Sequence, residues 1–196
     1  MGMELDYKII GICGNARSGK DTLGKNIKKI LNDNGIKSEI YSFANELKKS
    51  VDEFLIEQLK ISAFTEDEEE KKLIRPFLVF WGTDVMRKIN HNIWVEKVED
   101  KLHDSHVNII TDVRFINEID WVKRKKGLSI MIKRENNEPA NAYEKYNNEK
   151  LSLIVDNSFD VLHTEDDKML ELTANEILNS TINNEIFELW KATCPL

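Results

Sequence analysis

The sequence has few cysteines and no apolar run long enough to cross a membrane. The cysteines are Cys13 and Cys194, and their spacing offers no ligand set for a metal cluster. We expect both to be reduced thiols, with Cys13 a small core residue at the end of an apolar run. The N-terminus also lacks a basic segment followed by an apolar one, so a cytoplasmic protein without a membrane partner is expected.

Positive charge is also in short supply, which excludes one class of function. Lys and Arg total 28 against 35 Asp and Glu, a formal net charge of −7. A protein that coats nucleic acid needs a net basic surface, so a nucleic-acid polymer is not an expected partner. A small nucleotide remains possible as substrate, because it needs only a local cluster of Arg and Lys.

Apolar runs alternate with segments of helical periodicity along the 196 residues, which predicts one soluble α/β domain. Some strands are apolar throughout, so the sheet should be mainly parallel and covered on both faces. Ligands of such sheets bind beyond the C-terminal ends of the strands. The expected strands are 7–13, 38–43, 107–112, 128–133 and 159–163, and the expected helices are 23–31, 47–55, about 75–85, 117–126, 170–178 and 182–190.

A phosphate-binding loop follows the first predicted strand. Its residues are Gly14, Asn15, Ala16, Arg17, Ser18, Gly19, Lys20, Asp21 and Thr22. They match G-x-x-x-x-G-K, whose glycines let backbone N–H groups point at phosphate oxygens. Lys20 should reach the β- and γ-phosphates of ATP, whereas Thr22 would serve an α-phosphate or cap the helix. The alternative, a glycine turn that only caps a helix, fits the flanking strand and amphipathic helix less well.

Asp21 stands where most such loops carry a Ser or Thr hydroxyl that binds Mg²⁺. A carboxylate there could bind Mg²⁺ directly or hold one of its waters. A second carboxylate, Asp112, lies at the predicted tip of strand 107–112. It would hold Mg²⁺ through water or face the acceptor, and Arg114 could grip a phosphate with its planar fork. A structural ion pair between Asp112 and Arg114 is the alternative.

A third group runs from Trp81 to Arg87, with Arg75 shortly before it. An aromatic plane, the polar Thr83 and Asp84, and a guanidinium are what a nucleoside monophosphate requires. The residues alone slightly favour the plainer alternative, in which Trp81 is simply a core residue beside Phe77 and Phe80. The four histidines lack a partner at ligand spacing, so no metal role is expected for them.

Three segments, 17–22, 80–87 and 111–118, together resemble the bacteriophage deoxynucleoside monophosphate kinases. The turn at 43–48 is also similar, and Asp after the loop lysine is itself a trait of that family. Two departures are Ile116, where the family often has Pro, and the region 135–153, which lacks the expected His-containing segment.

The resemblance implies phosphorylation of deoxynucleoside monophosphates by ATP with Mg²⁺, in a three-layer α/β/α P-loop fold. It implies a single domain with a helical substrate-binding insertion at about 44–105 and a lid-like loop at about 135–150. The polar composition of 135–148, rich in Asn and Glu, itself predicts a mobile loop there. A homodimer, and a host-cell cytoplasm if a phage encodes the chain, are further implications. The implied catalytic set is Lys20, Arg87, Asp112 and Arg114. The implied substrate-binding set is Lys48, Arg75, Trp81, Thr83, Asp84, Arg87, Arg114, Glu118 and Arg134.

Two other functions stay open at this point. Another small-molecule P-loop kinase, of the phosphomevalonate or dephospho-coenzyme A type, would share Lys20 and Asp112 but would have no use for the Trp81 to Arg87 group. A non-catalytic nucleotide-binding module would be expected to carry a guanine-specifying N-K-x-D motif, which the sequence lacks.

Overall fold

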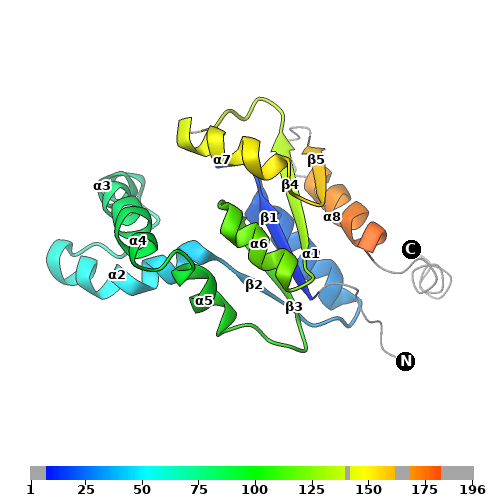
Figure 1. Ribbon diagram of the computed structural model, residues 1–196, viewed down its shortest axis with the longest axis horizontal. Coiled ribbons are helices and arrows are strands. Elements are labelled where there is room, and N and C mark those ends of the chain that lie inside the picture. The colour runs from blue at the N-terminus through cyan, green and yellow to red at the C-terminus, as the bar shows by residue number, and fades with distance from the viewer. Residues whose placement is uncertain (1–7, 140–141, 162–167, 182–196) are drawn as a thin grey trace. The chain divides into compact units, whose positions relative to one another are not determined.

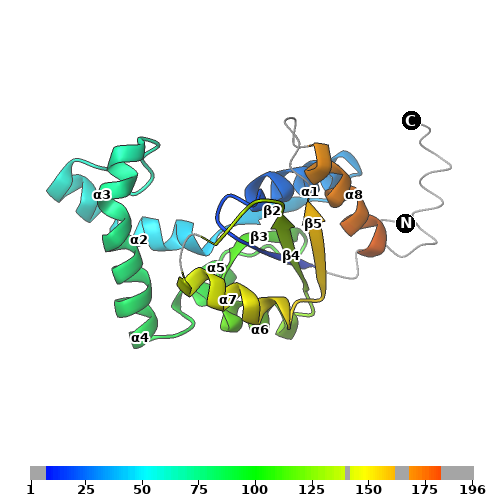
Figure 2. The ribbon, with the colours of Figure 1, turned by 90° about the horizontal axis from the view of Figure 1, so that it is seen from above.

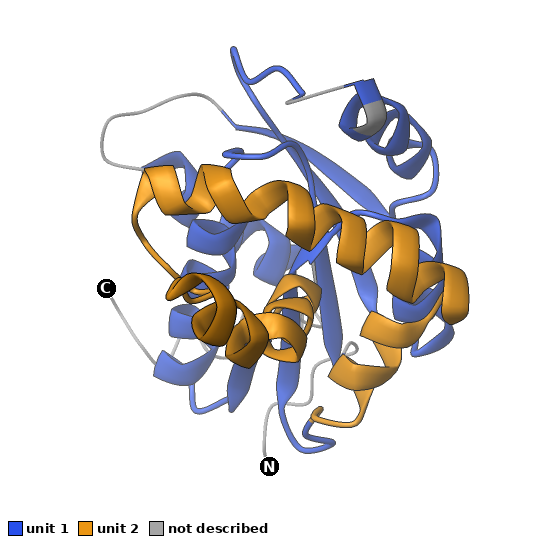
Figure 3. Cartoon of the chain, turned by 90° about the vertical axis from the view of Figure 1, so that its left-hand side faces the viewer, with its two compact units in different colours: residues 1–41, 103–196 blue, residues 42–102 orange. Residues whose placement is uncertain are grey.

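The computed structural model describes residues 8–139, 142–161 and 168–181. The chain divides into two compact units (Figure 3): the first comprises residues 1–41 and 103–196, and the second comprises residues 42–102. The second unit interrupts the first between consecutive strands of one sheet.

The first unit is built on a five-stranded parallel sheet with the order β2-β3-β1-β4-β5. Its strands are β1 (Ile9–Cys13), β2 (Ser38–Tyr41), β3 (Val107–Val113), β4 (Leu128–Arg134) and β5 (Asn157–Val161). Every residue of β1 and β3 is buried, as expected for central strands covered on both faces. The prediction of a mainly parallel α/β sheet is therefore confirmed.

Helices cover both faces of this sheet and complete a three-layer arrangement (Figures 1 and 2). α1 (Lys20–Asp33) and α8 (Lys168–Thr181) lie on one side, and α6 (Ile116–Arg124) and α7 (Ala142–Ser152) lie on the other. Apolar side chains at helical spacing in α1 and α8 pack onto the strands, because that spacing gives a helix one apolar face. The buried residues of this layer are Ile10, Ile12, Leu23, Ile27, Leu31, Ile109, Ile130, Leu170, Ala174 and Ile177.

Helix α7 departs from the sequence prediction, which placed a mobile loop at about 135–150. Among its described side chains only Leu151 is buried, so the segment has almost no apolar periodicity to reveal a helix. The predicted helix at 182–190, together with His163, Cys194 and Tyr7, lies outside the described residues.

The second unit is helical. It contains α2 (Phe43–Leu59), α3 (Glu68–Val79), a π-helical segment η1 (Phe80–Met86), the short α4 (Arg87–Ile89) and α5 (Ile93–Glu99). α2 begins where strand was expected, because the Ser42 hydroxyl accepts a hydrogen bond from the Asn45 N–H at 3.3 Å and caps the helix. The unit has its own small core of Val51, Leu55, Ala63 and Ile74.

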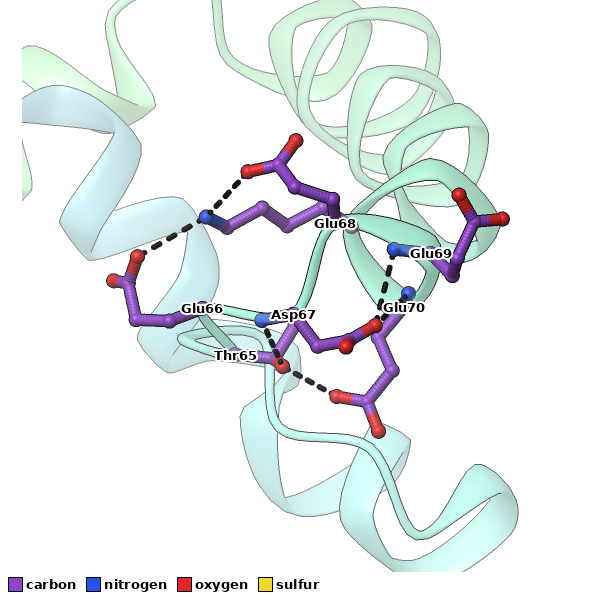
Figure 4. A network of polar contacts seen from close by, with 7 residues as sticks. Thr65, Glu66, Asp67, Glu68, Glu69 and Glu70 are labelled. Atoms are coloured by element: carbon purple, nitrogen blue, oxygen red, sulfur yellow. Dashed lines mark hydrogen bonds and ion pairs between the residues drawn. The ribbon is translucent and has the colours of Figure 1, made fainter.

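The acidic stretch at 66–70 forms the start of α3 (Figure 4), which begins at Glu68 rather than near Pro76 as the sequence analysis expected. Asp67 accepts hydrogen bonds from the N–H groups of Glu69 and Glu70 at 3.0 and 2.9 Å. Carboxylates in a first turn also stabilise a helix through its dipole. The acidic residues therefore start a helix, and Pro76 lies inside it.

Candidate active site

The loop between β1 and α1 has the curled backbone that a phosphate-binding loop requires. Three of its residues have positive φ angles, namely Gly14 at 147°, Arg17 at 63° and Gly19 at 93°. A Cβ on Gly14 would collide with the carbonyl oxygen of Ile132, and a Cβ on Gly19 would lie 2.7 Å from Leu170 Cδ1. Both positions need glycine for conformation, and Gly14 needs it for space as well, because its neighbour is a backbone oxygen.

Lys20 opens α1 beneath this loop with 7% of its surface exposed. Its Nζ donates hydrogen bonds to the carbonyl oxygens of Gly14 at 3.0 Å and Asn15 at 2.5 Å. Burial, followed by the nearby positive charge of Arg114, lowers the pKa of Lys20 from its usual 10.5 to about 8. The carboxylates of Glu144, Asp21 and Asp112 act in the opposite direction. Lys20 is thus held at the phosphate loop, close to both positively and negatively charged side chains.

Sheet register brings the end of β3 to this loop. β1 pairs directly with β3, and Cys13 lies opposite Val113, so Gly14 and Arg114 follow neighbouring strand ends. Asp112 is 8% exposed, whereas Arg114 is exposed. The structure therefore gathers Lys20, Asp112 and Arg114 at one edge of the sheet, where a parallel α/β fold binds its ligands.

The two candidate magnesium ligands belong to the same edge. Thr111, in β3, donates its hydroxyl hydrogen to Asp21 Oδ1 at 2.7 Å, which orients the exposed carboxylate of Asp21. Carboxylates suit Mg²⁺, and in kinases this ion is held by one or two carboxylates together with waters and substrate phosphates. Asp21 and Asp112 fit that requirement. Within the described residues no group of three or more His, Cys, Asp or Glu forms a protein-only metal site.

Glu118 acts on the backbone rather than facing the open side of the site. It is 1% exposed, and its Oε2 accepts hydrogen bonds from the N–H groups of Arg114 at 2.7 Å and Phe115 at 3.1 Å. The carboxylate thereby satisfies donors at the start of α6 and positions the backbone that carries Arg114. Substrate contact by Glu118, which the resemblance implies, stays a prediction that this burial does not favour.

Cys13 and Arg134 lie at the ends of the two strands beside the loop. The Cys13 thiol is buried and donates a hydrogen bond to the Ile130 carbonyl oxygen at 3.2 Å. Burial raises its pKa to about 12, so the thiol stays protonated and serves as the core residue that was expected. Arg134 is half-buried as the last residue of β4.

Helix α7 and the turn before it contact the phosphate loop through side chains that the sequence analysis did not identify. Asn15 Nδ2 donates to the Asn137 carbonyl oxygen at 2.6 Å, and Asn137 Nδ2 donates to the Ala16 carbonyl oxygen at 3.1 Å. Asn148 Nδ2 donates to Asn15 Oδ1 at 2.6 Å. The Ala16 N–H donates to Glu144 Oε1 at 3.0 Å. We call these four hydrogen bonds the loop clasp; no sequence pattern marked Asn137, Glu144 or Asn148, its members outside the phosphate loop.

The remaining predicted site residues all belong to the second unit. Trp81 is half-buried and continues a stack of rings, with its centroid 6.4 Å from that of Phe77 at an interplanar angle of 16°. Phe77 in turn stacks on Phe54 at 5.8 Å. The Trp81 Nε1–H donates to the Ser50 hydroxyl at 3.2 Å. Trp81 packs against the core of this unit, which supports the plainer of the two interpretations of this residue.

Three polar residues of the predicted substrate-binding set, Lys48, Asp84 and Arg87, have partners inside the same unit. Arg87 Nη1 donates to the His91 carbonyl oxygen at 3.5 Å, and Asp84 lies 3.9 Å from Lys88 Nζ. Lys48 Nζ lies 5.4 Å from the centroid of the Phe64 ring. Arg75 is exposed and Thr83 is half-buried. Substrate contact by these residues stays a prediction.

Gly82 has a packing role in this unit that its place in the motif did not indicate. A Cβ there would collide with Leu47 Cδ1 of α2, and its carbonyl oxygen accepts a hydrogen bond from Trp94 Nε1 at 3.1 Å. The absence of a side chain therefore lets η1 approach α2 closely.

None of the helices in the described part of the chain is long and apolar enough to span a membrane.

Comparison with known proteins adds a family and a fold. The family model described as phosphomevalonate kinase matches residues 12–128. A shikimate kinase structure from Acinetobacter baumannii, in complex with shikimate, is 12% identical with a TM-score of 0.50, covering 91% of this chain and 94% of that one. A gluconokinase from Sinorhizobium meliloti 1021 is 10% identical with a TM-score of 0.49, covering 94% of this chain and 99% of that one. An APS kinase from Mycobacterium tuberculosis is 11% identical with a TM-score of 0.45, covering 91% of this chain and 97% of that one. No curated protein matches.

Proposed function

Because the chain belongs to the phosphomevalonate kinase family, we propose that it transfers the γ-phosphoryl group of ATP to a small phosphate monoester of the phosphomevalonate type. The observation that carries this proposal is the closeness of two cations at the strand ends. Lys20 opens the helix after the phosphate loop that follows β1, and Arg114 follows β3, which pairs with β1 so that Cys13 lies opposite Val113. Arg114 is also near enough to lower the pKa of Lys20. One cation suits the phosphates of ATP, and the other suits a second phosphate, that of the acceptor.

The proposed reaction needs little covalent help from the protein. An oxygen of the acceptor phosphate forms a bond to the γ-phosphorus, and the bond from that phosphorus to the β,γ-bridging oxygen breaks. The products are a diphosphate ester and ADP. The attacking oxygen is already anionic, so no general base is required, and catalysis rests on positioning and charge neutralisation.

Each residue at the strand ends has a proposed part in this reaction. Lys20 and the loop N–H groups hold the β- and γ-phosphates, and Arg114 holds the acceptor phosphate against repulsion from ATP. Asp21 and Asp112 would hold Mg²⁺, which would supply positive charge to neutralise the phosphate oxygens during transfer. Glu118 keeps the Arg114 backbone in place.

A deoxynucleoside monophosphate is the second candidate acceptor, favoured by the sequence from Phe80 to Arg87 and by the other segments that resemble phage kinases. Its phosphate would react in the same way, so Lys20 and Arg114 keep their parts. The Trp81 ring that would stack its base already stacks with Phe77 and has its Nε1–H hydrogen-bonded to Ser50, whereas the family match favours the phosphomevalonate type. We therefore place it second.

An ADP-release assay with ATP and Mg²⁺ tests the proposal across a panel of acceptors. Phosphomevalonate, dephospho-coenzyme A and each deoxynucleoside and nucleoside monophosphate are compared with mevalonate and the free nucleosides. We expect turnover only with an acceptor that carries a phosphate, and loss of that turnover in Lys20→Ala. Turnover with nucleoside monophosphates alone would refute the phosphomevalonate-type acceptor and support a nucleotide acceptor instead. ADP release that no phosphorylated acceptor stimulates would refute the proposed function.

A further inference from the structure

Glu144 binds the phosphate loop in the way that a phosphate oxygen would. Its Oε1 accepts the Ala16 N–H at 3.0 Å, and Ala16 lies inside the glycine-bounded loop. The same carboxylate is near enough to Lys20 to favour its charged form. Loop N–H groups and the loop lysine are the donors that hold nucleotide phosphates in proteins of this kind. One carboxylate thus interacts both with a loop N–H group and with the loop lysine.

A carboxylate and a phosphate compete for such donors because each is an anion that accepts hydrogen bonds. Their simultaneous presence would also place negative charges side by side in a partly buried site, where repulsion is poorly screened. The Glu144 contact and full binding of a triphosphate therefore oppose each other.

We propose that Glu144 is an internal competitor of the nucleotide, and that α7 leaves the phosphate loop when ATP binds. The inference rests on the part of the proposed function that places ATP at this loop. The loop clasp is the closed form, in which Asn148 holds Asn15 and Glu144 holds Ala16. Nucleotide binding exchanges the Glu144 carboxylate for phosphate oxygens and releases the helix.

The character of α7 is consistent with such movement. Leu151, near its C-terminal end, is the buried one among the side chains described for this helix, whereas Ala142, Lys145, Tyr146, Glu149 and Lys150 are exposed. Segments with few buried apolar contacts open at low cost in free energy. The end that carries Glu144 is therefore held mainly by polar contacts.

Calorimetric titration with a non-hydrolysable ATP analogue and Mg²⁺ tests the proposal on three variants of the full chain. Glu144→Gln removes the competing charge. Asn148→Ala loosens the clasp without changing any charge. Glu149→Gln makes the same charge change on an exposed residue of the same helix and is the matched control.

If the closed form dominates without nucleotide, a substitution that abolishes this form lowers the apparent dissociation constant by a factor of about the ratio of closed to open molecules. We expect the dissociation constant to fall about tenfold for Glu144→Gln and about threefold for Asn148→Ala, and to change less than about twofold for Glu149→Gln. An unchanged or larger dissociation constant in Glu144→Gln would overturn the proposal. Equal tightening in Glu149→Gln would also overturn it, because the effect would then be one of net charge.

Hydrogen exchange of the wild-type chain gives an independent readout on the helix. Amides of 144–152 should exchange faster with the analogue bound than without it. Slower exchange would mean that α7 closes over the nucleotide, which is the opposite of the proposed movement.

The two hypotheses fail in different ways. If the wild-type chain binds the analogue and Glu144→Gln binds it equally well, the competitor is refuted and the kinase function stands. If the wild-type chain and all three variants bind no analogue, both are refuted.

Discussion

The lowered pKa of Lys20 makes nucleotide binding dependent on pH in a range where few groups titrate. Burial and Arg114 bring this pKa to about 8, whereas phosphates beside the bound ammonium group would raise it again. Binding therefore takes up a proton wherever Lys20 is neutral in the free protein. The affinity is fully present well below pH 8 and falls progressively as the pH rises through this pKa.

The magnitude comes from the fraction of Lys20 that is charged before binding. With a pKa of about 8, roughly three-quarters of the molecules carry the charge at pH 7.5 and roughly one-tenth at pH 9. The dissociation constant for the ATP analogue should therefore rise about eightfold between these two pH values. Above pH 9 the rise approaches about tenfold for each pH unit.

Calorimetric titration at pH 7.5, 8.25 and 9 measures this slope, and buffers of different ionisation enthalpy count the protons taken up. Lys20→Arg is the matched control, because an arginine stays charged throughout the range. It should bind the analogue with a dissociation constant that is nearly independent of pH, whatever its absolute affinity. Arg114→Gln should move the fall in affinity of the wild-type lysine to higher pH, since it removes a cause of the low pKa.

Two results would refute this reasoning. A wild-type affinity that stays constant from pH 7.5 to 9 would show that Lys20 is charged throughout or does not contact the nucleotide. An equal slope in Lys20→Arg would assign the titration to another group.

Two further substitutions test the geometry of the strand ends. Gly14→Ala should lower the free energy of unfolding by about 3 kcal/mol and abolish nucleotide binding, because the new Cβ meets the Ile132 carbonyl oxygen at a φ of 147°. Gly35→Ala, at a φ of 74° with no atom near the new Cβ, should cost only about 1 kcal/mol in urea unfolding; equal losses for the two glycines would contradict the close contact. Glu118→Ala should cost about 2 kcal/mol by leaving the Arg114 and Phe115 N–H groups without their acceptor. Glu118→Ala should also raise the KM for the acceptor substrate. Glu118→Gln keeps an oxygen that can accept these hydrogen bonds, so it should restore most of the stability and most of the affinity for that substrate. An unchanged KM in Glu118→Ala would show that Glu118 does not position Arg114.

Local pattern was enough to predict the sheet and most of its helices. The strands containing Ile10, Ile109 and Ile130 are short apolar runs, and α1 repeats its apolar residues at helical spacing. Boundaries were harder where capping decides them. Ser42 ends the predicted second strand by starting α2, and Asp67 starts α3 well before Pro76. Helix α7 escaped prediction because it is polar nearly all round.

The sequence by itself determined the phosphate loop, because glycine spacing, the following lysine and the flanking elements are all encoded within a short stretch. It also indicated that Asp112 and Arg114 end a strand, and parallel pairing then places such ends together. The resemblance to phage kinases led toward a nucleotide acceptor, whereas the family match favours the phosphomevalonate type that the sequence analysis had kept as an alternative.

Only the tertiary structure decided how the side chains of the site act on one another. Thr111 orients Asp21 across 90 positions of sequence, and Glu144 reaches Ala16 across 128. Arg114 shifts the pKa of Lys20 although one residue follows β3 and the other opens α1. No local periodicity records such contacts, because they arise from the order in which parallel strands pair and from the helix packed over their ends. The chemistry of each residue can be recognised in the sequence, but the neighbours that set its charge and access are brought to it by the fold.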